Sequence, residues 1–167
     1  MSEESMIGDP FNPLGVTFNP VSPALIKVRL IATALTILPI AIAFGFFAHL
    51  FSVPWLYAGT AVSVLIGVWL GWLIPRQVRA MGYARTSEDL LWRKGVMFRS
   101  VTVVPYGRMQ YVDVNEGPIA RHYGIATVTL HTASASTDAT IHGLPKEEAA
   151  QLREQLSALG EARLAGL

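Results

Sequence analysis

Residues 30–51 read LIATALTILPIAIAFGFFAHLF and residues 55–75 read WLYAGTAVSVLIGVWLGWLIP, and these two apolar stretches decide the fold. No Lys, Arg, Asp or Glu occurs between Arg29 and Arg76. A helix rises about 1.5 Å per residue, so either stretch can cross a hydrocarbon core of about 30 Å. Backbone groups in lipid must pair within the protein, which favours helices. The sequence therefore predicts two helical membrane spans.

Only residues 52–54 separate the predicted spans, so we expect an antiparallel hairpin over residues 27–76. The outer ends of this hairpin carry basic residues, whereas the link is uncharged: Lys27, Arg29, Arg76 and Arg79. Because positively charged flanks stay in the cytoplasm, we expect a multi-pass protein of the inner (plasma) membrane with both termini cytoplasmic. The first stretch is not expected to be a signal peptide, because a signal peptide would begin earlier and be shorter.

Composition limits the chemistry open to the chain. The absence of Cys excludes disulfides, thiolate metal sites and a cysteine nucleophile. The four His show no metal-ligand spacing, and no catalytic or phosphate-binding motif occurs. A net charge of +1 by itself implies no polyanion partner, so sequence-specific nucleic-acid binding has no support. We therefore expect no enzyme, no cofactor, no metal and no nucleic-acid partner.

The first 26 residues predict a flexible tail. They contain three acidic residues, no basic ones, and the tripeptide Phe-Asn-Pro at both 11–13 and 18–20. Proline biases the residue before it toward extended backbone, so an irregular or strand-like segment is expected. The two aromatic residues either anchor the tail to the membrane or to the following domain, or are incidental in a disordered leader.

A change of period after residue 76 predicts a β-rich domain over residues 77–160. Alternating apolar and polar residues, separated by short turns, indicate strands. Six strands are expected: 81–85, 90–93, 101–104, 110–115, 125–132 and 137–142. Consecutive strands of this number must curl to bury one face, which predicts a barrel or a strongly bent sheet.

A C-terminal amphipathic helix is expected to cover the open end of that sheet. Pro145 suits its first position, and Gly160 suits its end, which leaves residues 161–167 as a tail. Its apolar face is predicted to comprise Ala149, Leu152, Leu156 and Leu159.

The domain also carries a spaced pattern of small and apolar residues: Arg108 to Val114, Gly117-Pro118, Arg121, Tyr123-Gly124, Ala126-Thr127-Val128 and Thr132-Ala133. With Val21-Ser22-Pro23 upstream, it resembles the bacterial pleckstrin-homology-like (PH-like) family, and more narrowly the YdbS-like membrane proteins. The resemblance implies an α+β membrane protein: a two-helix hairpin, then a PH-like barrel or bent sheet with a helical cap. It also implies a seventh strand, around 117–123 or within 77–85.

Several basic residues at and after the end of the second span are candidates for a face toward anionic lipid, where each would contribute about 1 kcal/mol. The alternative is that they only set topology or are solvated. They are Arg76, Arg79, Arg85, Arg93, Lys94 and Arg99.

Two further pairs of residues are candidate contact sites. Gly67 and Gly71 form a G-x-x-x-G pattern, which favours either self-association or packing against the first span. Arg121 and Tyr123, on an expected tight turn, form either a partner epitope or a structural turn in which Gly124 has positive φ.

These observations predict a non-enzymatic, membrane-tethered interaction module in contact with the lipid bilayer. Its expected partner is a copy of itself or a second envelope membrane protein, and the resemblance suggests one that bears several similar domains. The alternative is a domain that senses anionic lipid at the inner leaflet.

Overall fold

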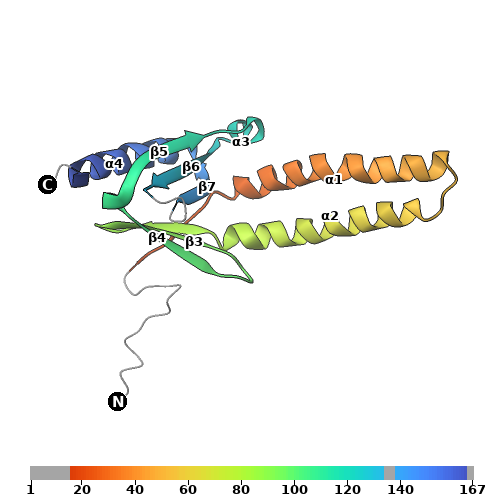
Figure 1. Ribbon diagram of the computed structural model, residues 1–167, viewed down its shortest axis with the longest axis horizontal. Coiled ribbons are helices and arrows are strands. Elements are labelled where there is room, and N and C mark those ends of the chain that lie inside the picture. The colour runs from red at the N-terminus through yellow and green to blue at the C-terminus, as the bar shows by residue number, and fades with distance from the viewer. Residues whose placement is uncertain (1–15, 134–137, 165–167) are drawn as a thin grey trace, which may run out of the picture.

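The computed structural model describes residues 16–133 and 138–164, and shows a long helical hairpin projecting from a compact mixed domain (Figure 1). Helices α1 (Ala24–Leu50) and α2 (Leu56–Arg79) run antiparallel and cover the predicted spans except for Phe51 and Trp55. Ser52, with φ of 53°, turns the chain between them. Both helices extend past the apolar stretches at the domain end, so the expected hairpin is confirmed and its helices are longer than predicted.

The surface of the hairpin is apolar. Both helices are long and apolar enough to cross a membrane. Large hydrophobic side chains point outward along their length; Leu35, Leu65 and Val68 are 64–68% exposed. A helix from a soluble core would bury such residues, and soluble proteins seldom expose a continuous apolar surface of this extent. The exposed surface therefore needs hydrocarbon around it.

Within the described residues, the domain has seven strands in two antiparallel sheets, one ordered β1-β2-β3-β4 and the other β5-β6-β7. All six predicted strands are present, with bounds shifted by a few residues. The bounds are β1 Asn19–Pro20, β2 Gly82–Arg85, β3 Asp89–Lys94, β4 Ser100–Pro105, β5 Met109–Asn115, β6 Ile125–Thr132 and β7 Ala139–Pro145.

The seventh strand lies upstream of the hairpin rather than at either expected place. Asn19 pairs with Tyr83 and Pro20 with Gly82, so β1 extends the first sheet. Residues 16–26 thus differ from the flexible tail expected there, because β1 pairs with β2 and α1 already begins at Ala24; residues 1–15 lie outside the described residues. The membrane hairpin is an insertion between β1 and β2 of the domain.

The segment expected to hide a strand forms helix α3 (Pro118–His122) instead. Gly117 precedes it with extended backbone, and Pro118 occupies its first turn, where a missing N–H costs nothing. Gly124 has a φ of 64°, so the positive φ considered for it is confirmed.

The two sheets do not close into a barrel, which corrects one of the two expected arrangements. β4 and β5 are joined by a 3-10 turn, Tyr106–Arg108, and do not pair with each other. Pro105 ends β4 and lacks the N–H that a continuing ladder would need. The bent, open pair of sheets is therefore the correct description.

Helix α4 (Lys146–Leu164) packs over β5 and the 3-10 turn, as the predicted cap does. Ala149, Leu152 and Leu156 are buried, but Leu159 is 38% exposed and does not join the core. The helix continues to Leu164, so Gly160 does not end it. The apolar face is shorter than predicted because the sheets below it end before the last turns of the helix (Figure 1).

The hydrophobic core joins the domain to the base of the hairpin. Leu25 of α1 and Ile74 and Val78 of α2 belong to the same cluster as Trp92. At Gly143, with φ of 75°, an added Cβ would lie 2.8 Å from the side chain of Leu25. The helices are therefore packed into the domain rather than tethered to it.

Candidate functional site

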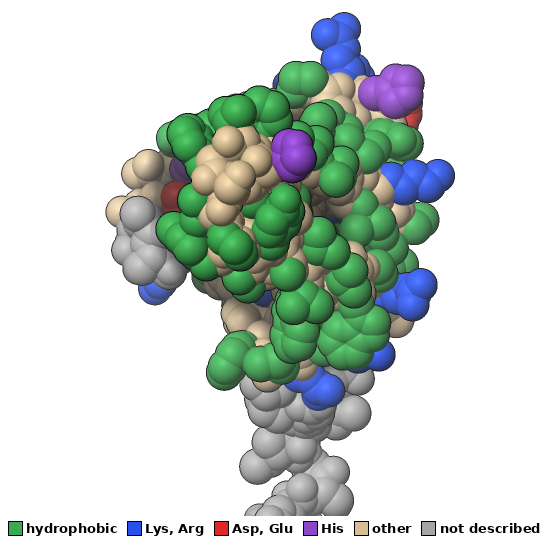
Figure 2. Space-filling view, turned by 90° about the vertical axis from the view of Figure 1, so that its right-hand side faces the viewer, with side chains coloured by type: hydrophobic (Ala, Val, Ile, Leu, Met, Phe, Trp, Pro, Cys, Tyr) green, Lys and Arg blue, Asp and Glu red, His purple; other side chains and the backbone are tan. Residues whose placement is uncertain are grey.

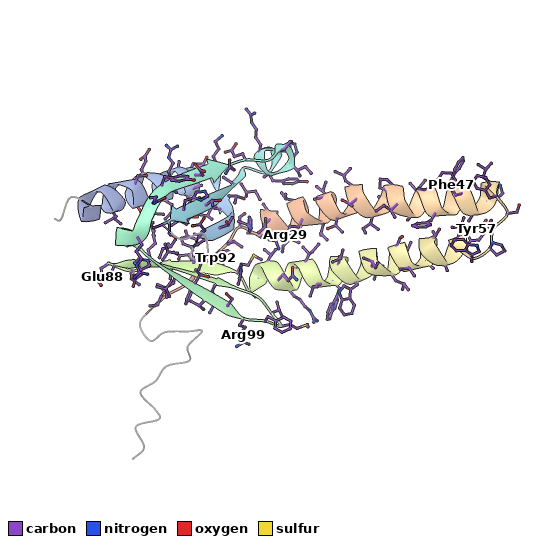
Figure 3. The ribbon with its side chains drawn as sticks, in the orientation of Figure 1. Arg29, Phe47, Tyr57, Glu88, Trp92 and Arg99 are labelled. Atoms are coloured by element: carbon purple, nitrogen blue, oxygen red, sulfur yellow. The ribbon has the colours of Figure 1, made fainter. Side chains whose placement is uncertain are left out.

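The end of the domain from which the hairpin emerges is the candidate functional site, and we call it the hairpin-side face. It comprises the first turns of α1, the last turns of α2, helix α3 and the turn between β3 and β4 (Figure 3). Because the helices continue from this face into their apolar stretches, it is the part of the domain next to the bilayer.

The four basic residues expected to set topology all lie at the domain ends of the helices. Lys27 and Arg29 are in the first turns of α1, and Arg76 and Arg79 are in the last turn of α2. Figure 2, which views the molecule from the free end of the hairpin, shows Lys and Arg around the rim of a largely hydrophobic surface. The guanidinium of Arg76 lies 3.5 Å from the ring centre of Trp72, a cation–π contact typical of a membrane interface.

The other basic candidates do not form one face. The guanidinium of Arg93 lies 4.4 Å from the ring centre of Phe18, so it is engaged by the segment that leads into β1. Arg85 donates a hydrogen bond of 2.6 Å to the Gln155 side chain of α4, away from the hairpin. Of the six, Lys94 and Arg99 flank the β3–β4 turn. The structure thus divides the predicted basic face among three surroundings.

The β3–β4 turn carries an apolar tip that sequence reasoning missed. Val96, Met97 and Phe98 are 41%, 79% and 85% exposed, and we call them the 96–98 tip. Gly95, with φ of 100°, makes the tight turn that presents them, because an added Cβ would collide with the Phe98 carbonyl oxygen. The signal was available: three successive apolar residues occupy a turn, where polar residues are usual.

The two glycines of the G-x-x-x-G pattern have different surroundings. They line a groove between α1 and α2 of about 430 Å³. An added Cβ on Gly67 would lie 3.4 Å from a methyl group of Ile37, so this glycine faces the first span of its own chain. An added Cβ on Gly71 would meet nothing within 4 Å. The two glycines therefore line one groove, in which Gly67 faces the first span and Gly71 faces open space.

Arg121 and Tyr123 lie at the end of α3. Arg121 is exposed, whereas Tyr123 is half-buried and its ring contacts that of His122 edge-on, with centres 5.2 Å apart. The Tyr123 N–H bonds to the carbonyl oxygens of Ile119 and Ala120, which closes the helix. The two residues are adjacent in space but differ in exposure, so Arg121 is the one available for contact.

A polar array on the second sheet also escaped the sequence analysis. His131 Nδ1 lies 3.1 Å from an Asp138 carboxylate oxygen, and His131 Nε2 lies 3.4 Å from one of Asp113. The Tyr111 ring stacks on His131 with centres 4.4 Å apart. The backbone N–H of Thr132 donates to Asp138, and this bond, followed by the contact with His131, holds the pKa of Asp138 below its ordinary value.

This array links β5 and β6 to Asp138, the residue before β7, and its contacts hold these segments together. Asp113 is distant from His131 in the chain, and the register of β5 on β6 brings the two together. Among the described residues, no group of three or more His, Asp or Glu could hold a metal ion.

His142 occupies a different position, on β7 beside the hairpin base. Its Nδ1 lies 3.4 Å from the Thr127 hydroxyl. Burial lowers its pKa below 6.5, and the positive charges of Arg29 and Lys94 lower that pKa further. The neutral imidazole is therefore favoured in the folded protein.

Two exposed apolar helices packed into a bent, two-sheet domain with a C-terminal helix define a membrane-anchored PH-like protein. The family model "Bacterial PH domain" matches residues 24–160, so the chain belongs to the bacterial PH domain family. It is similar to "UPF0699 transmembrane protein YdbS" of Bacillus subtilis (strain 168), with 30% identity over 151 residues, covering 84% of this chain and 91% of the relative. No solved structure matches the chain significantly.

Proposed function

We propose that this protein is a non-enzymatic recruitment module that binds a second membrane protein by strand addition at β4, on the cytoplasmic face of the membrane. The observation that carries the proposal is the open edge of the first sheet. β4 is the last strand in the order β1-β2-β3-β4, and among the described residues it pairs only with β3.

The chemistry of β4 suits strand addition. Its six residues, SVTVVP, carry no charge, and Val103 is 47% exposed. Soluble proteins commonly protect such an edge with lysines, bulges or a covering helix, because its unpaired backbone groups can pair with another chain. A partner strand would gain main-chain hydrogen bonds from β4 and an apolar contact from Val103.

Geometry favours a different protein over a second copy as the partner. Figure 1 shows β4 running broadly along the direction of the hairpin. Two copies in one membrane are related by rotation about the membrane normal, which would align their β4 strands in parallel. Parallel pairing is slightly less stable than antiparallel pairing. A partner with its own chain direction has no such restriction, and its membrane helix could also contact the groove beside Gly71.

The cytoplasmic placement is supported by charge. β1 and β2 pair with each other, so both ends of the hairpin emerge on one side of the membrane. The basic residues at those ends, Lys27, Arg29, Arg76 and Arg79, favour the cytoplasm for that side.

Photo-crosslinking in native membranes tests the recruitment proposal. A benzophenone amino acid at Val103 of the full chain should give one discrete product that contains a second protein. The same group at Leu159, an exposed apolar residue of α4, is the matched control and should give none. No product from Val103, the same product from both positions, or a product made of two copies of this chain would contradict the proposal.

Anionic-lipid sensing, the other candidate function, has weaker support. Arg93 and Arg85 are engaged by Phe18 and Gln155, so the basic face that a sensor would need is divided. Lys94 and Arg99 remain beside the 96–98 tip, where they favour attachment to the protein's own membrane.

A further inference from the structure

We propose that the 96–98 tip inserts into the same leaflet that α1 and α2 enter, and gives the domain a third contact with the bilayer. The occupant of this apolar surface is the lipid of the protein's own membrane. The inference is independent of the recruitment proposal, because it concerns a different element and needs no partner.

Exposure of the tip is the first argument. Met97 and Phe98 are among the most exposed hydrophobic residues of the protein, at 79% and 85%. In the part of the chain that the structure describes, the other hydrophobic residues with comparable exposure lie on the hairpin, which the bilayer surrounds; Trp55, at 72%, is one. Removing a large apolar side chain from water is favourable. A tip of three such exposed side chains therefore indicates a surface that is covered in the working protein.

The 96–98 tip also lies at the depth of the membrane interface. The tip shares a groove with Leu73, Gln77 and Met81 at the end of α2. Leu73 belongs to the apolar stretch that ends at residue 75, so the tip lies beside the helix where that stretch leaves the hydrocarbon. In Figure 3 the β3–β4 turn points in the same direction as the hairpin, with Arg99 near its end. A bilayer around α2 would therefore meet the tip at its interface.

Charge around the tip is the third argument. Lys94 and Arg99 stand on either side of it and are exposed, and Arg76 and Arg79 end the neighbouring helix. Apolar residues flanked by basic ones suit a leaflet edge, where the apolar side chains enter acyl chains and the cations meet anionic headgroups. A soluble partner would have to enter between this face and the membrane to cover the same residues.

A third contact with the bilayer would restrict how the domain tilts relative to the membrane. The hairpin alone lets the domain tilt with the helices about their entry point. A third contact, displaced from both helices along the sheet, would fix that tilt. Because β4 leaves directly from the tip at Ser100, its open edge would then keep one orientation to the membrane.

The experiment uses the full chain in lipid nanodiscs, where both membrane faces are accessible. The natural sequence has no Cys, so Met97→Cys gives a single attachment point for a polarity-sensitive fluorophore. The matched control is Ser87→Cys in the β2–β3 turn, which is also exposed. In Figure 3 the neighbouring Glu88 lies at the opposite end of the domain from the hairpin.

We expect the fluorophore at position 97 to emit at shorter wavelength than the one at position 87. It should lose most of its emission to nitroxide attached to lipid near the headgroups, and little to iodide in solution. The control should show the reverse. Iodide quenching at position 97 equal to that at position 87 would overturn the proposal. Protection at position 97 from both quenchers would also overturn it, because protein would then cover the tip.

Discussion

At the scale of single residues, His142 is a half-buried titratable group whose pKa is lowered by burial and by the charges of Arg29 and Lys94. Its imidazole lies under the hairpin base, and the charges of Arg29 and Lys94 act on it in the same direction as burial. Protonation would add a third positive charge to this region. The folded protein therefore resists protonation of His142 more than the unfolded chain does.

This difference predicts acid sensitivity. A His with a lowered pKa in the folded state stabilises the fold above its ordinary value of 6.5, and that contribution is lost as pH falls below 6.5, because the unfolded chain binds the proton first. We expect the thermal stability of the detergent-solubilised protein to fall between pH 7 and the folded-state pKa. Tryptophan fluorescence can report unfolding, because Trp92 is 2% exposed in the folded domain whereas the other three Trp lie on the hairpin.

The variant His142→Gln should lose most of this pH dependence, whereas His122→Gln, at an exposed site on α3, should keep it. Identical pH profiles for the natural protein and His142→Gln would show that His142 is not the group responsible.

At the scale of elements, the contact of α1 with β7 holds the hairpin in the domain. The Ser22 N–H donates to the Gly143 carbonyl oxygen at 2.8 Å, and the backbone of Gly143 approaches Leu25 closely. Only glycine combines a φ of 75° with this approach at no cost.

Gly143→Ala should therefore destabilise the protein by about 1–3 kcal/mol, because the added Cβ meets Leu25 and the backbone is in the left-handed region. Gly117→Ala is the control, since its φ is −75° and its added Cβ meets nothing within 4 Å. Denaturant unfolding in detergent measures both. Equal stability of the two variants would show that α1 is not seated through Gly143.

The same scale shows what the sequence could predict. Long apolar runs and clean alternation, as in residues 125–132, identify their elements from local pattern alone. β1 could not be found this way, because Asn19 and Pro20 have poor strand propensity and are held only by pairing with β2. Gly117 followed by Pro118 is a local signal for the start of helix α3. A strand was expected there instead, because the resemblance implied a seventh strand.

The candidate site was predicted less well than the fold, for a related reason. Basic residues were grouped by sequence proximity, but the partners of Arg93 and Arg85 come from distant segments. The contact of Asp113 with His131 also needs the register of β5 on β6, which alternation does not give. The 96–98 tip was readable locally and was missed because the turn was identified from Lys94-Gly95 alone.

At the scale of the whole molecule, the hairpin inserted between β1 and β2 makes the anchor part of the domain. The shared core of Leu25, Ile74 and Val78 with Trp92 makes helix tilt and domain orientation one movement. A membrane protein that engages a partner through a sheet edge would benefit from this rigidity, because the edge is presented at a fixed height.

The arrangement across the membrane is the claim on which the rest depends, and cysteine accessibility in intact cells tests it most directly. Ser52→Cys lies in the turn between α1 and α2, and Ser87→Cys lies in the domain, so each gives one thiol in a chain that has none. We predict that an impermeant maleimide labels position 52 in intact cells and position 87 only after lysis. Labelling of position 87 in intact cells, with position 52 protected until lysis, would contradict the account.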